Sequence, residues 1–415
     1  MKSELPFHLI LGLMVFGFAA NSPAQEKTAF HFDFGDGRPK PGQIQVSPTN
    51  IYSAEAGYGF EPGATVVAGD RYITSTNPFY FSVKLPEGNY RVIAGLDNPS
   101  GESTMTVKAE LRRLMLEQVH PAVGKSETRS FIVNLRTPQI AGGGKVHLKP
   151  REMTNEWWAW DEKLTVEFNG RHPELASLWI EKADVPTVFL LGDSTVCDQP
   201  AEPWNSWGQM LPRFFKPDIA IANHAESGET IANSLRARRF EKIFSLMKPG
   251  DYLFVQFGHN DMKIHDTNAL DIYKAALKQV VAETRAKGGT PVLVTSMERK
   301  AGITADTLMG YPTAVREVAG EEKCALIDLN AMSVTLYKAL GTNLDLAFQD
   351  PTHHNNYGSY ELAKCVLAGI QQDKLPLASH IVDDFKGFDP SHPDLADRFQ
   401  MALSPRSSSA KPLGN

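Results

Sequence analysis

A serine, an aspartate and a histidine in the second half of the chain have the order and setting used for acyl transfer. Gly192-Asp-Ser-Thr195 directly follows an apolar run, and Asp350-Pro-Thr-His353 comes much later in the chain. A serine hydroxyl is a weak nucleophile at neutral pH, so it needs an imidazole that accepts its proton and a carboxylate that orients the imidazole. The pattern predicts Ser194 as nucleophile, His353 as base and Asp350 as the orienting carboxylate.

The cysteines offer a second nucleophile, because Cys197 lies shortly after Ser194. No thiol-activating motif surrounds Cys197, so we interpret it as a small buried residue. The other two cysteines are Cys324 and Cys365. In an oxidising compartment two of the three can pair and at least one stays free, so the sequence leaves their pairing open.

A metal centre is the chemical alternative to the serine mechanism. Histidines and acidic residues that could supply nitrogen and oxygen ligands are His259, Asp261, His265, Asp266, Asp350, His353 and His354. Their spacing matches no metal motif, and a metal centre would leave Ser194 without a role. We therefore predict no metal and no cofactor.

Other polar and aromatic residues near these segments have structural interpretations. Asp193 is expected to fix the turn after its strand, and His259 and Asp261 are expected to hold their loop. Trp204 and Trp207 could form a platform for a sugar ring, but Trp207 precedes a helix start and is expected to pack in the core. The sequence identifies no substrate-binding residue.

The composition is that of a globular chain without a strongly charged surface. The 415 residues are 42% hydrophobic and carry a formal net charge of -6. This length and apolar content favour two domains with buried cores. Nucleic acids and anionic membranes need clustered lysine and arginine, and the one short basic cluster, at 236–239, is expected on a solvated helix face. We predict neither partner, and the oligomeric state is left open.

Residues 1–24 have the layout of a secretory signal. Lys2 precedes an apolar stretch at 7–20, and Ser22-Pro-Ala24 supplies the small residues of a cleavage site. The stretch is shorter than the ~20 residues that a membrane-spanning helix needs, and no later segment is long and apolar enough. We expect export to the periplasm or the cell exterior, and no membrane span in the mature protein.

Short strand-like segments separated by Gly, Pro and Asn fill residues 25–183. Their alternating or β-branched residues predict strands at 30–34, 80–85, 90–94, 131–135, 163–168 and 177–181. Residues 108–119 have a helix-like composition, but strand-like segments flank them, so we interpret them as a long strand or strand pair. Many short strands joined by turns predict an all-β sandwich of the jelly-roll type.

From residue 184 onward, apolar strand-like runs alternate with longer amphipathic segments. They predict strands at 187–191, 219–222, 252–257, 291–295 and 325–328, and helices at 231–247, 270–287 and 357–371. This alternation is typical of a parallel sheet covered by helices on both faces, a three-layer α/β/α domain. Ligands bind such a sheet beyond the carboxyl ends of its strands, where Ser194 falls. We expect this domain to span 184–403, and the polar residues 404–415 to be a disordered tail.

Four short blocks follow one another along this second domain: Gly192-Asp-Ser-Thr195, Asn223-His-Ala-Glu-Ser-Gly228, Gly258-His-Asn-Asp261 and Asp350-Pro-Thr-His353. In this order they resemble the blocks of the SGNH, or GDSL-type, hydrolases, over residues 186 to about 371. The resemblance implies a flavodoxin-like α/β/α fold and a carboxylic ester hydrolase. It also implies a catalytic triad of Ser194, His353 and Asp350.

The resemblance further implies how the oxyanion of the reaction is bound. Its donors would be the backbone N–H groups of Ser194 and Gly228 and the side-chain amide of Asn260. Glycine at 228 has no Cβ, so the backbone there can approach a substrate closely. The Asp-x-x-His spacing selects His353 over the adjacent His354, whose role is left open.

The residues within the blocks resemble those of the rhamnogalacturonan acetylesterase branch of the family. The resembling features are Gly-Asp-Ser-Thr, Gly-His-Asn-Asp, and Asp-x-Thr-His followed by Asn-x-x-Gly. Phe32-Asp-Phe-Gly35 and Gly57-Tyr-Gly-Phe60 resemble the start of a galactose-binding-like β-sandwich, whose glycan binding is left open. The resemblance implies removal of acetyl groups from pectin rhamnogalacturonan or another acetylated polysaccharide. The alternatives are an acetyl xylan esterase, another carbohydrate or lipid esterase of the same fold, and a non-catalytic carbohydrate-binding protein.

Overall fold

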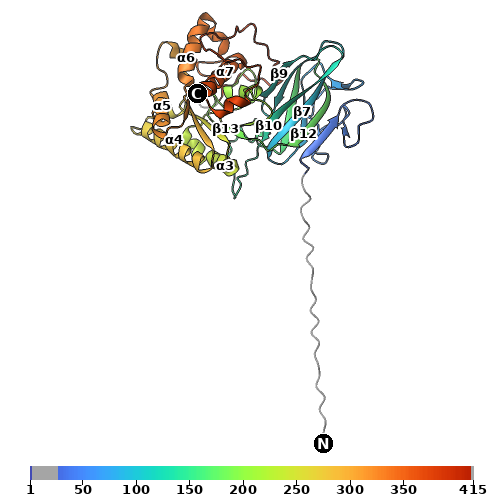
Figure 1. The fold of residues 1–415 in the computed structure, drawn as a ribbon, viewed down its shortest axis with the longest axis horizontal. Coiled ribbons are helices and arrows are strands. Elements are labelled where there is room, and N and C mark those ends of the chain that lie inside the picture. Colours follow the sequence, from blue (N-terminus) through green and yellow to red (C-terminus); the bar gives the residue numbers. More distant parts are fainter. Residues whose placement is uncertain (2–26, 413–415) are drawn as a thin grey trace.

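The computed structural model describes Met1 and residues 27–412, in which an all-β region precedes an α/β region (Figure 1). The predicted export signal falls mostly in residues 2–26, which lie outside the described part of the chain. Within the described residues, no helix combines the length and the apolar character needed to cross a membrane.

The all-β region is a sandwich of two mostly antiparallel sheets. Its strands are β1 (Ala29–Asp33), β2 (Ile44–Gln45), β3 (Tyr58–Phe60), β4 (Val67–Ala68), β5 (Ile73–Thr74), β6 (Phe79–Lys84), β7 (Gly88–Asn98), β8 (Thr104–Ala109), β9 (Arg113–Val119), β10 (Lys125–Leu135), β11 (Lys163–Arg171) and β12 (Glu174–Lys182). One sheet has the order β10-β7-β12-β1-β2, with β5 and β4 beside β12, and the other has the order β3-β6-β11-β8-β9. Because side chains alternate across a strand, aromatic residues such as Phe32 and Phe81 meet between the sheets, with ring centroids 5.0 Å apart.

The segment 108–119 is a strand pair, as one of the two interpretations predicted. Strands β8 and β9 form an antiparallel hairpin whose turn is Glu110-Leu111-Arg112. Glu110 and Arg112 have φ angles of 55° and 62°, the left-handed conformation that lets a short turn reverse the chain. This turn points toward the α/β region and carries Arg112 into it.

The α/β region is built on a parallel sheet of the order β14-β13-β15-β16-β17. Its elements are β13 (Thr187–Gly192), α1 (Trp207–Met210), β14 (Ala220–Asn223), α2 (Ile231–Arg236), α3 (Arg239–Leu246), β15 (Tyr252–Gln256), α4 (Ala269–Ala286), β16 (Thr290–Val294), α5 (Tyr311–Glu322), β17 (Ala325–Ile327), α6 (Leu329–Leu340) and α7 (Asn356–Gln372). Short 3-10 helices cover Trp157–Ala159, Leu211–Phe214, Asp261–Lys263, Lys300–Ile303, Gly341–Ala347 and Pro376–His380.

Helices cover both faces of this sheet, so the predicted three-layer α/β fold after a β-sandwich is confirmed. Val188 and Leu190 of β13 pack with α1, α6 and α7, whereas Phe189 and Leu191 pack with α2 to α5. Alternate side chains of the buried strand β13 therefore pack into the two hydrophobic cores on opposite faces of the sheet. The helix predicted at 231–247 is interrupted, because Arg238 between α2 and α3 has a φ of 62°.

The two regions share a buried, charged junction. Arg113 at the start of β9 is fully buried and lies 3.3 Å from a carboxylate oxygen of Asp198, just after β13. Apolar contacts continue the junction, where Ile132 of β10 packs with Val185 and Ala220. A buried arginine that reaches a carboxylate and two carbonyls, here those of Asn134 and Ile221, fixes orientation as well as position.

The structure differs from the expected disordered tail over residues 404–408. The Glu202 N–H donates to the Arg406 carbonyl at 2.8 Å, and Ser404 is 5% exposed and donates through its hydroxyl to Glu167 of β11. Serines and prolines in this segment reduce its apolar content, but hydrogen bonds to both regions hold it in place. The polar composition of residues 404–408 therefore did not predict that this segment is ordered.

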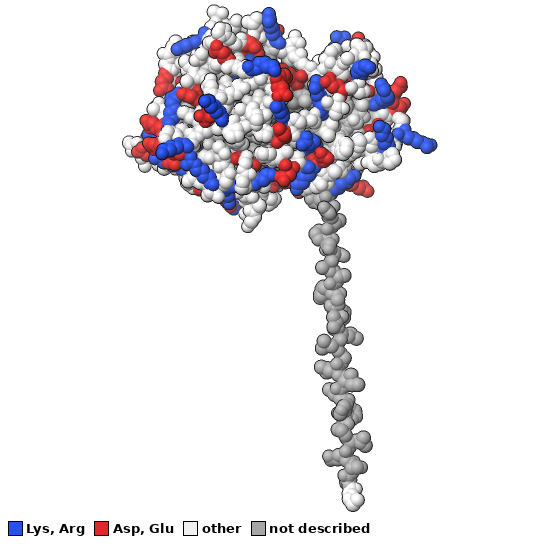
Figure 2. All heavy atoms as spheres, viewed as in Figure 1, with Lys and Arg blue, Asp and Glu red and all other residues white. Residues whose placement is uncertain are grey.

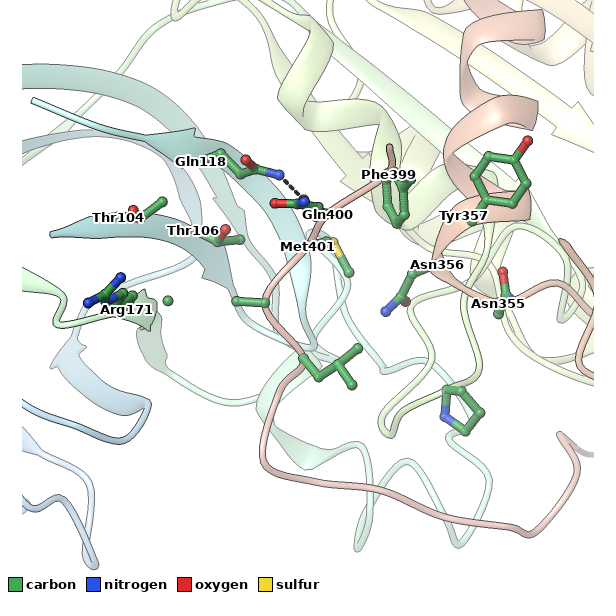
Figure 3. A pocket seen from close by; sticks show the side chains of 14 residues that line it. Thr104, Thr106, Gln118, Arg171, Asn355, Asn356, Tyr357, Phe399, Gln400 and Met401 are labelled. Carbon is green, nitrogen blue, oxygen red and sulfur yellow. Dashed lines mark hydrogen bonds between the residues drawn. The ribbon is translucent and has the colours of Figure 1, made fainter. Parts of the chain in front are cut away.

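A cavity of about 750 Å³ lies where residues 399–403 run between the sandwich and the start of α7 (Figure 3). Gln118 of β9 donates a hydrogen bond to the Gln400 carbonyl at its wall, and Asn355 and Asn356 line the opposite side. None of the predicted site residues lines it. Figure 2 shows lysine, arginine, aspartate and glutamate interspersed over the visible face of both regions.

Candidate active site

Ser194 lies where β13 ends, in a tight turn held by Asp193. The Asp193 carboxylate accepts hydrogen bonds from the Thr195 backbone N–H at 3.0 Å and from the Thr195 hydroxyl at 2.7 Å. Burial alone would raise the pKa of Asp193, but the neighbouring His259 ring and these hydrogen bonds hold it below its ordinary value. Asp193 therefore stabilises the turn that presents Ser194, in agreement with its structural interpretation.

The structure brings Ser194, His353 and Asp350 into one hydrogen-bonded chain. His353 Nε2 is 2.8 Å from Ser194 Oγ, and His353 Nδ1 is 3.0 Å from Asp350 Oδ2. Ser194 and His353 are 4% and 1% exposed. These distances are those of a nucleophile, a base and an orienting carboxylate.

Asp350 is held as a carboxylate by its own loop. Its Oδ1 accepts the backbone N–H groups of Thr352 and His353, both at 2.7 Å, while Oδ2 faces the imidazole. Burial acts to raise the pKa of Asp350, but the hydrogen bonds and charge of His353 outweigh burial and keep that pKa below its ordinary value. The Asp-x-x-His spacing thus lets one carboxylate close the turn and orient the imidazole.

His354 does not share the position of His353. Its Nε2 is 2.9 Å from the Tyr337 hydroxyl, and its ring packs against Phe348 at a centroid distance of 4.1 Å. Burial, with the neighbouring His353, lowers the pKa of His354 to about 3, so its ring is neutral at neutral pH. His354 anchors the loop from behind while His353 faces the serine.

The oxyanion donors proposed from the sequence lie in segments that hydrogen bonds tie together. Gln199 Nε2 donates to the Ser194 carbonyl at 2.8 Å and lies 3.3 Å from Ser227 Oγ. Asn260 Nδ2 donates to the Glu229 carbonyl at 3.1 Å, which leaves its second hydrogen to point elsewhere.

The two backbone donors are available for a ligand. Within the described residues, the N–H groups of Ser194 and Gly228 form no hydrogen bond. Gly228 has a φ of 72°, a left-handed conformation in which a residue with a Cβ would be strained. An oxyanion-binding site requires unpaired N–H groups that can point at the oxygen of a ligand.

His259 and Asp261 hold the loop after β15 rather than face Ser194. His259 Nε2 is 3.0 Å from the Met297 carbonyl, and Asp261 Oδ1 accepts the Ile231 N–H at 3.0 Å. Among the described residues, no group of three or more His, Cys, Asp or Glu side chains is arranged to hold a metal ion.

Cys197 is a buried structural residue. Its Sγ is 3.2 Å from Ser227 Oγ, and burial raises its pKa to about 12. A thiol with such a pKa is not a nucleophile at neutral pH. Cys324 and Cys365 are also unpaired, and burial raises the pKa of both thiols.

Trp204 and Trp207 have different surroundings. Trp207 is fully buried and donates to Gln256 Oε1 at 2.8 Å, which is a core position. Trp204 is also buried, but its ring lies against His353, so it neither forms an exposed sugar platform nor belongs only to the core.

Sequence reasoning missed several residues around the site, because they come from elements without a motif. Gln199 donates to the Ser194 carbonyl, and Arg112 from the β8–β9 turn donates to the carbonyls of Gln199 and Trp204 at 3.1 and 3.0 Å. Lys149 and Arg151 approach from the long loop between β10 and β11. None of these residues lies in a motif or a periodic pattern that would have identified it.

Comparison with known proteins relates the α/β region to a family of known chemistry. A sequence model described as the GDSL-like Lipase/Acylhydrolase family matches residues 190–359, a range that includes Ser194, Gly228, Asn260, Asp350 and His353. The rhamnogalacturonan acetylesterase RhgT of Bacillus subtilis is 35% identical over 217 residues, which are 47% of this chain and 94% of that protein.

Two further relatives from Bacillus subtilis differ in how much of the chain they match. The probable rhamnogalacturonan acetylesterase YesY is 31% identical over 48% of this chain and 98% of its own length. The uncharacterized esterase YxiM is 28% identical over 90% of this chain and 98% of its own length. The match to YxiM therefore extends over the β-sandwich as well as the α/β region.

Proposed function

Because this chain belongs to the GDSL-like lipase/acylhydrolase family of carboxylic ester hydrolases, we propose that it is an exported serine esterase that removes acetyl groups from plant polysaccharide, in particular pectin rhamnogalacturonan. The observation that carries the proposal is the chain of contacts from Ser194 Oγ to His353 Nε2 and from His353 Nδ1 to Asp350 Oδ2. Glycan acetyl esters contain the carbonyl that such a serine attacks.

In the first half of the reaction, Ser194 Oγ attacks the acetyl carbonyl carbon while His353 Nε2 accepts the hydroxyl proton. Asp350 keeps the proton of His353 on Nδ1 and stabilises the imidazolium. The carbonyl oxygen becomes an oxyanion that accepts hydrogen bonds from Ser194 N–H, Gly228 N–H and Asn260 Nδ2. Collapse of the tetrahedral intermediate breaks the ester C–O bond, and His353 protonates the departing sugar hydroxyl.

In the second half, the acetyl group on Ser194 is released by water. His353 Nε2 accepts a proton from the water, whose oxygen attacks the acetyl carbonyl, and the same donors bind the second oxyanion. The intermediate expels Ser194 Oγ, which regains a proton from His353. The products are acetate and the free enzyme.

The substrate and the location rest on separate support. Two of the relatives are named as rhamnogalacturonan acetylesterases, one of them as a probable one, which favours a pectin substrate. The signal-like layout of residues 1–24 favours export to the periplasm or cell exterior, where such polymers are encountered.

The test is acetate release by purified protein from acetylated rhamnogalacturonan, with acetylated xylan and an acetylated lipid-like ester as the other substrates. We expect release from rhamnogalacturonan, and Ser194→Ala should abolish it while the melting temperature stays unchanged. Ser194→Cys is a matched variant that keeps a nucleophile of similar size.

The outcomes separate the alternatives. Equal release by Ser194→Ala would overturn the serine mechanism, and release from xylan alone would replace the proposed substrate. If no ester is cleaved but acetylated oligosaccharides still bind in calorimetry, the chain is a carbohydrate-binding protein. Periplasmic or extracellular recovery of the protein cleaved near residue 24, lost on deletion of residues 2–24, tests the export step.

A further inference from the structure

The carbonyl of Ser227 accepts hydrogen bonds from two cationic side chains of the β-sandwich region. Lys149 Nζ donates to it at 2.7 Å, and Arg151 Nη2 donates at 3.4 Å. Ser227 is 1% exposed, so this carbonyl is out of bulk water. Hydrogen bonds from charged donors in a dry environment are about twice as strong as neutral ones.

The same peptide group carries the N–H of Gly228, one of the oxyanion donors of the proposed reaction. The 227–228 peptide is trans, so its C=O and its N–H point in opposite directions within one plane. A donor on the carbonyl side therefore fixes the plane and, with it, the direction of the N–H. It also draws electron density toward the oxygen, which makes the N–H a stronger donor.

This peptide needs such support because of its glycine. Gly228 lacks a Cβ and takes a φ of 72°, so its own backbone does little to prevent rotation of the peptide plane. The Ser227 hydroxyl contacts, with Gln199 and Cys197, restrain the side chain but not the plane of the following peptide. Lys149 and Arg151 are the groups on the carbonyl itself.

Carboxylates hold both cations in place. Lys149 Nζ is 2.6 Å from Glu229 Oε1, and Arg151 forms an ion pair with Glu226 and lies 3.6 Å from Glu156. Glu226 and Glu229 are 4% and 1% exposed. Because these partners balance the charge, the effect on the oxyanion passes through the aligned peptide rather than through a net positive field.

We propose that Lys149 and Arg151 are positioning residues of the oxyanion hole, so that the β-sandwich completes the catalytic site of the neighbouring region. They act on the Ser227 carbonyl and thereby orient and polarise the Gly228 N–H. This inference rests on the proposed serine esterase function.

The experiment compares variants of the full chain on 4-nitrophenyl acetate, a small ester that needs no polysaccharide contacts. Removal of a whole oxyanion donor lowers kcat by about 10²–10³-fold. We expect a smaller loss, roughly tenfold for Lys149→Met and more for Lys149→Met with Arg151→Met, with KM nearly unchanged. Lys149→Arg should retain most activity.

Binding of phenylboronic acid distinguishes orientation of the donor from loose packing. A boronate forms a tetrahedral adduct with the serine and places an oxygen in the oxyanion hole, whereas acetate binds as a ground-state product. We expect the boronate dissociation constant to rise in Lys149→Met by about the factor lost in kcat/KM. The acetate inhibition constant should not change.

Two variants control for stability and for the loop. Lys149→Met leaves buried Glu229 without its cation, so Lys149→Met with Glu229→Gln removes that charge and should regain the melting temperature but not kcat. Arg406→Met removes a 2.5 Å hydrogen bond to the Asn155 carbonyl of the same loop but leaves the donors on the Ser227 carbonyl in place, and should leave kcat unchanged.

Two results would overturn the inference. In one, Lys149→Met and the double variant Lys149→Met with Arg151→Met keep the wild-type kcat while Ser194→Ala is inactive. In the other, Arg406→Met loses as much activity as Lys149→Met. If Ser194→Ala stays active, the proposed function itself fails, which is a separate outcome.

Discussion

The indole ring of Trp204 lies perpendicular to the imidazole ring of His353, with the ring centroids 5.9 Å apart and the planes at 89°. Trp204 is buried, and its Nε1 donates to the Ser408 carbonyl at 2.9 Å. The C-terminal segment therefore fixes the indole, and the indole restricts rotation of the imidazole that faces Ser194. An edge contact of this kind is worth about 0.5–1.5 kcal/mol beyond buried area.

We expect Trp204→Phe to lower kcat by a few-fold and Trp204→Ala to lower it by about tenfold, because an unsupported imidazole samples orientations away from Ser194. Acetate release and thermal unfolding are measured together. Trp207→Phe serves as the control, since Trp207 is fully buried and donates to Gln256 in the core: it should lower the melting temperature more than kcat. A larger kcat loss in Trp207→Phe than in Trp204→Ala would contradict this role.

Asp350→Asn should lower kcat by about 10³–10⁴-fold with a small change in KM. An asparagine amide can donate to His353 Nδ1 and so stabilise the tautomer that cannot accept the serine proton. Asp345→Asn is the matched control, because Asp345 precedes the same loop and pairs with Lys300 at the surface. It should keep wild-type activity. Comparable rates in wild type and Asp350→Asn would show that the imidazole needs no carboxylate.

The strand ends were predictable from sequence because a motif residue and its strand are adjacent in the chain. Ser194 follows β13 and Asn260 follows β15, and neighbouring parallel strands bring their ends together without further information. His353 was predictable from its spacing to Asp350. In the same way, the β-sandwich followed from alternating residues and turns.

The contacts that cross between the two regions were not predictable. Arg112 lies in a hairpin turn and Lys149 in a long loop, and neither residue has a periodic or motif signal. Half of their partners are backbone carbonyls, which any sequence provides. The ordered conformation of residues 404–408 could not be predicted for the same reason, because hydrogen bonds rather than apolar packing hold these residues.

Asp261→Asn should stabilise the protein above neutral pH. Burial raises the pKa of Asp261 to about 7, and within the described residues its Oδ2 has no hydrogen-bond partner. A carboxyl whose folded pKa exceeds its unfolded value of about 3.9 contributes stability below pH 4, which is lost as the pH rises toward 7. Asparagine is neutral throughout and can still accept the Ile231 N–H.

The measurement is the melting temperature of wild type and Asp261→Asn between pH 5 and pH 8.5. We expect the difference to favour the variant increasingly from pH 5 to pH 8, by up to about 1.4 kcal/mol for each unit of raised pKa. Asp271→Asn, on the exposed start of α4, should leave the pH profile unchanged. A variant that is less stable than wild type at pH 8 would mean that the charged carboxylate is favourable there.

Arg112 and Glu202 form the central ion pair between the two regions. Arg112 Nη2 is 2.5 Å from Glu202 Oε2, and both side chains are 5% exposed. Burial acts to raise the pKa of Glu202, but the charges of Arg112 and Lys108 outweigh it and hold that pKa below its ordinary value. Glu202 therefore contributes stability above its unfolded pKa of about 4.3, and this contribution is lost as the pH falls through the lower folded value.

Arg112→Met should lower the free energy of unfolding by about 3 kcal/mol at pH 7, because it leaves a buried carboxylate without its main cation. Without Arg112 the pKa of Glu202 rises, so Glu202 becomes neutral at a higher pH and the deficit should shrink toward pH 4.5. Arg112→Met with Glu202→Gln removes the uncompensated charge and should recover part of the stability at pH 7.

Arg112 also holds the carbonyls of Gln199 and Trp204, so activity at pH 7 should fall in both variants, including the one with recovered stability. Urea unfolding midpoints at the two pH values and initial rates of acetate release measure these effects. A deficit that stays constant from pH 7 to pH 4.5 would mean that lost packing, rather than the charge of Glu202, destabilises the variant.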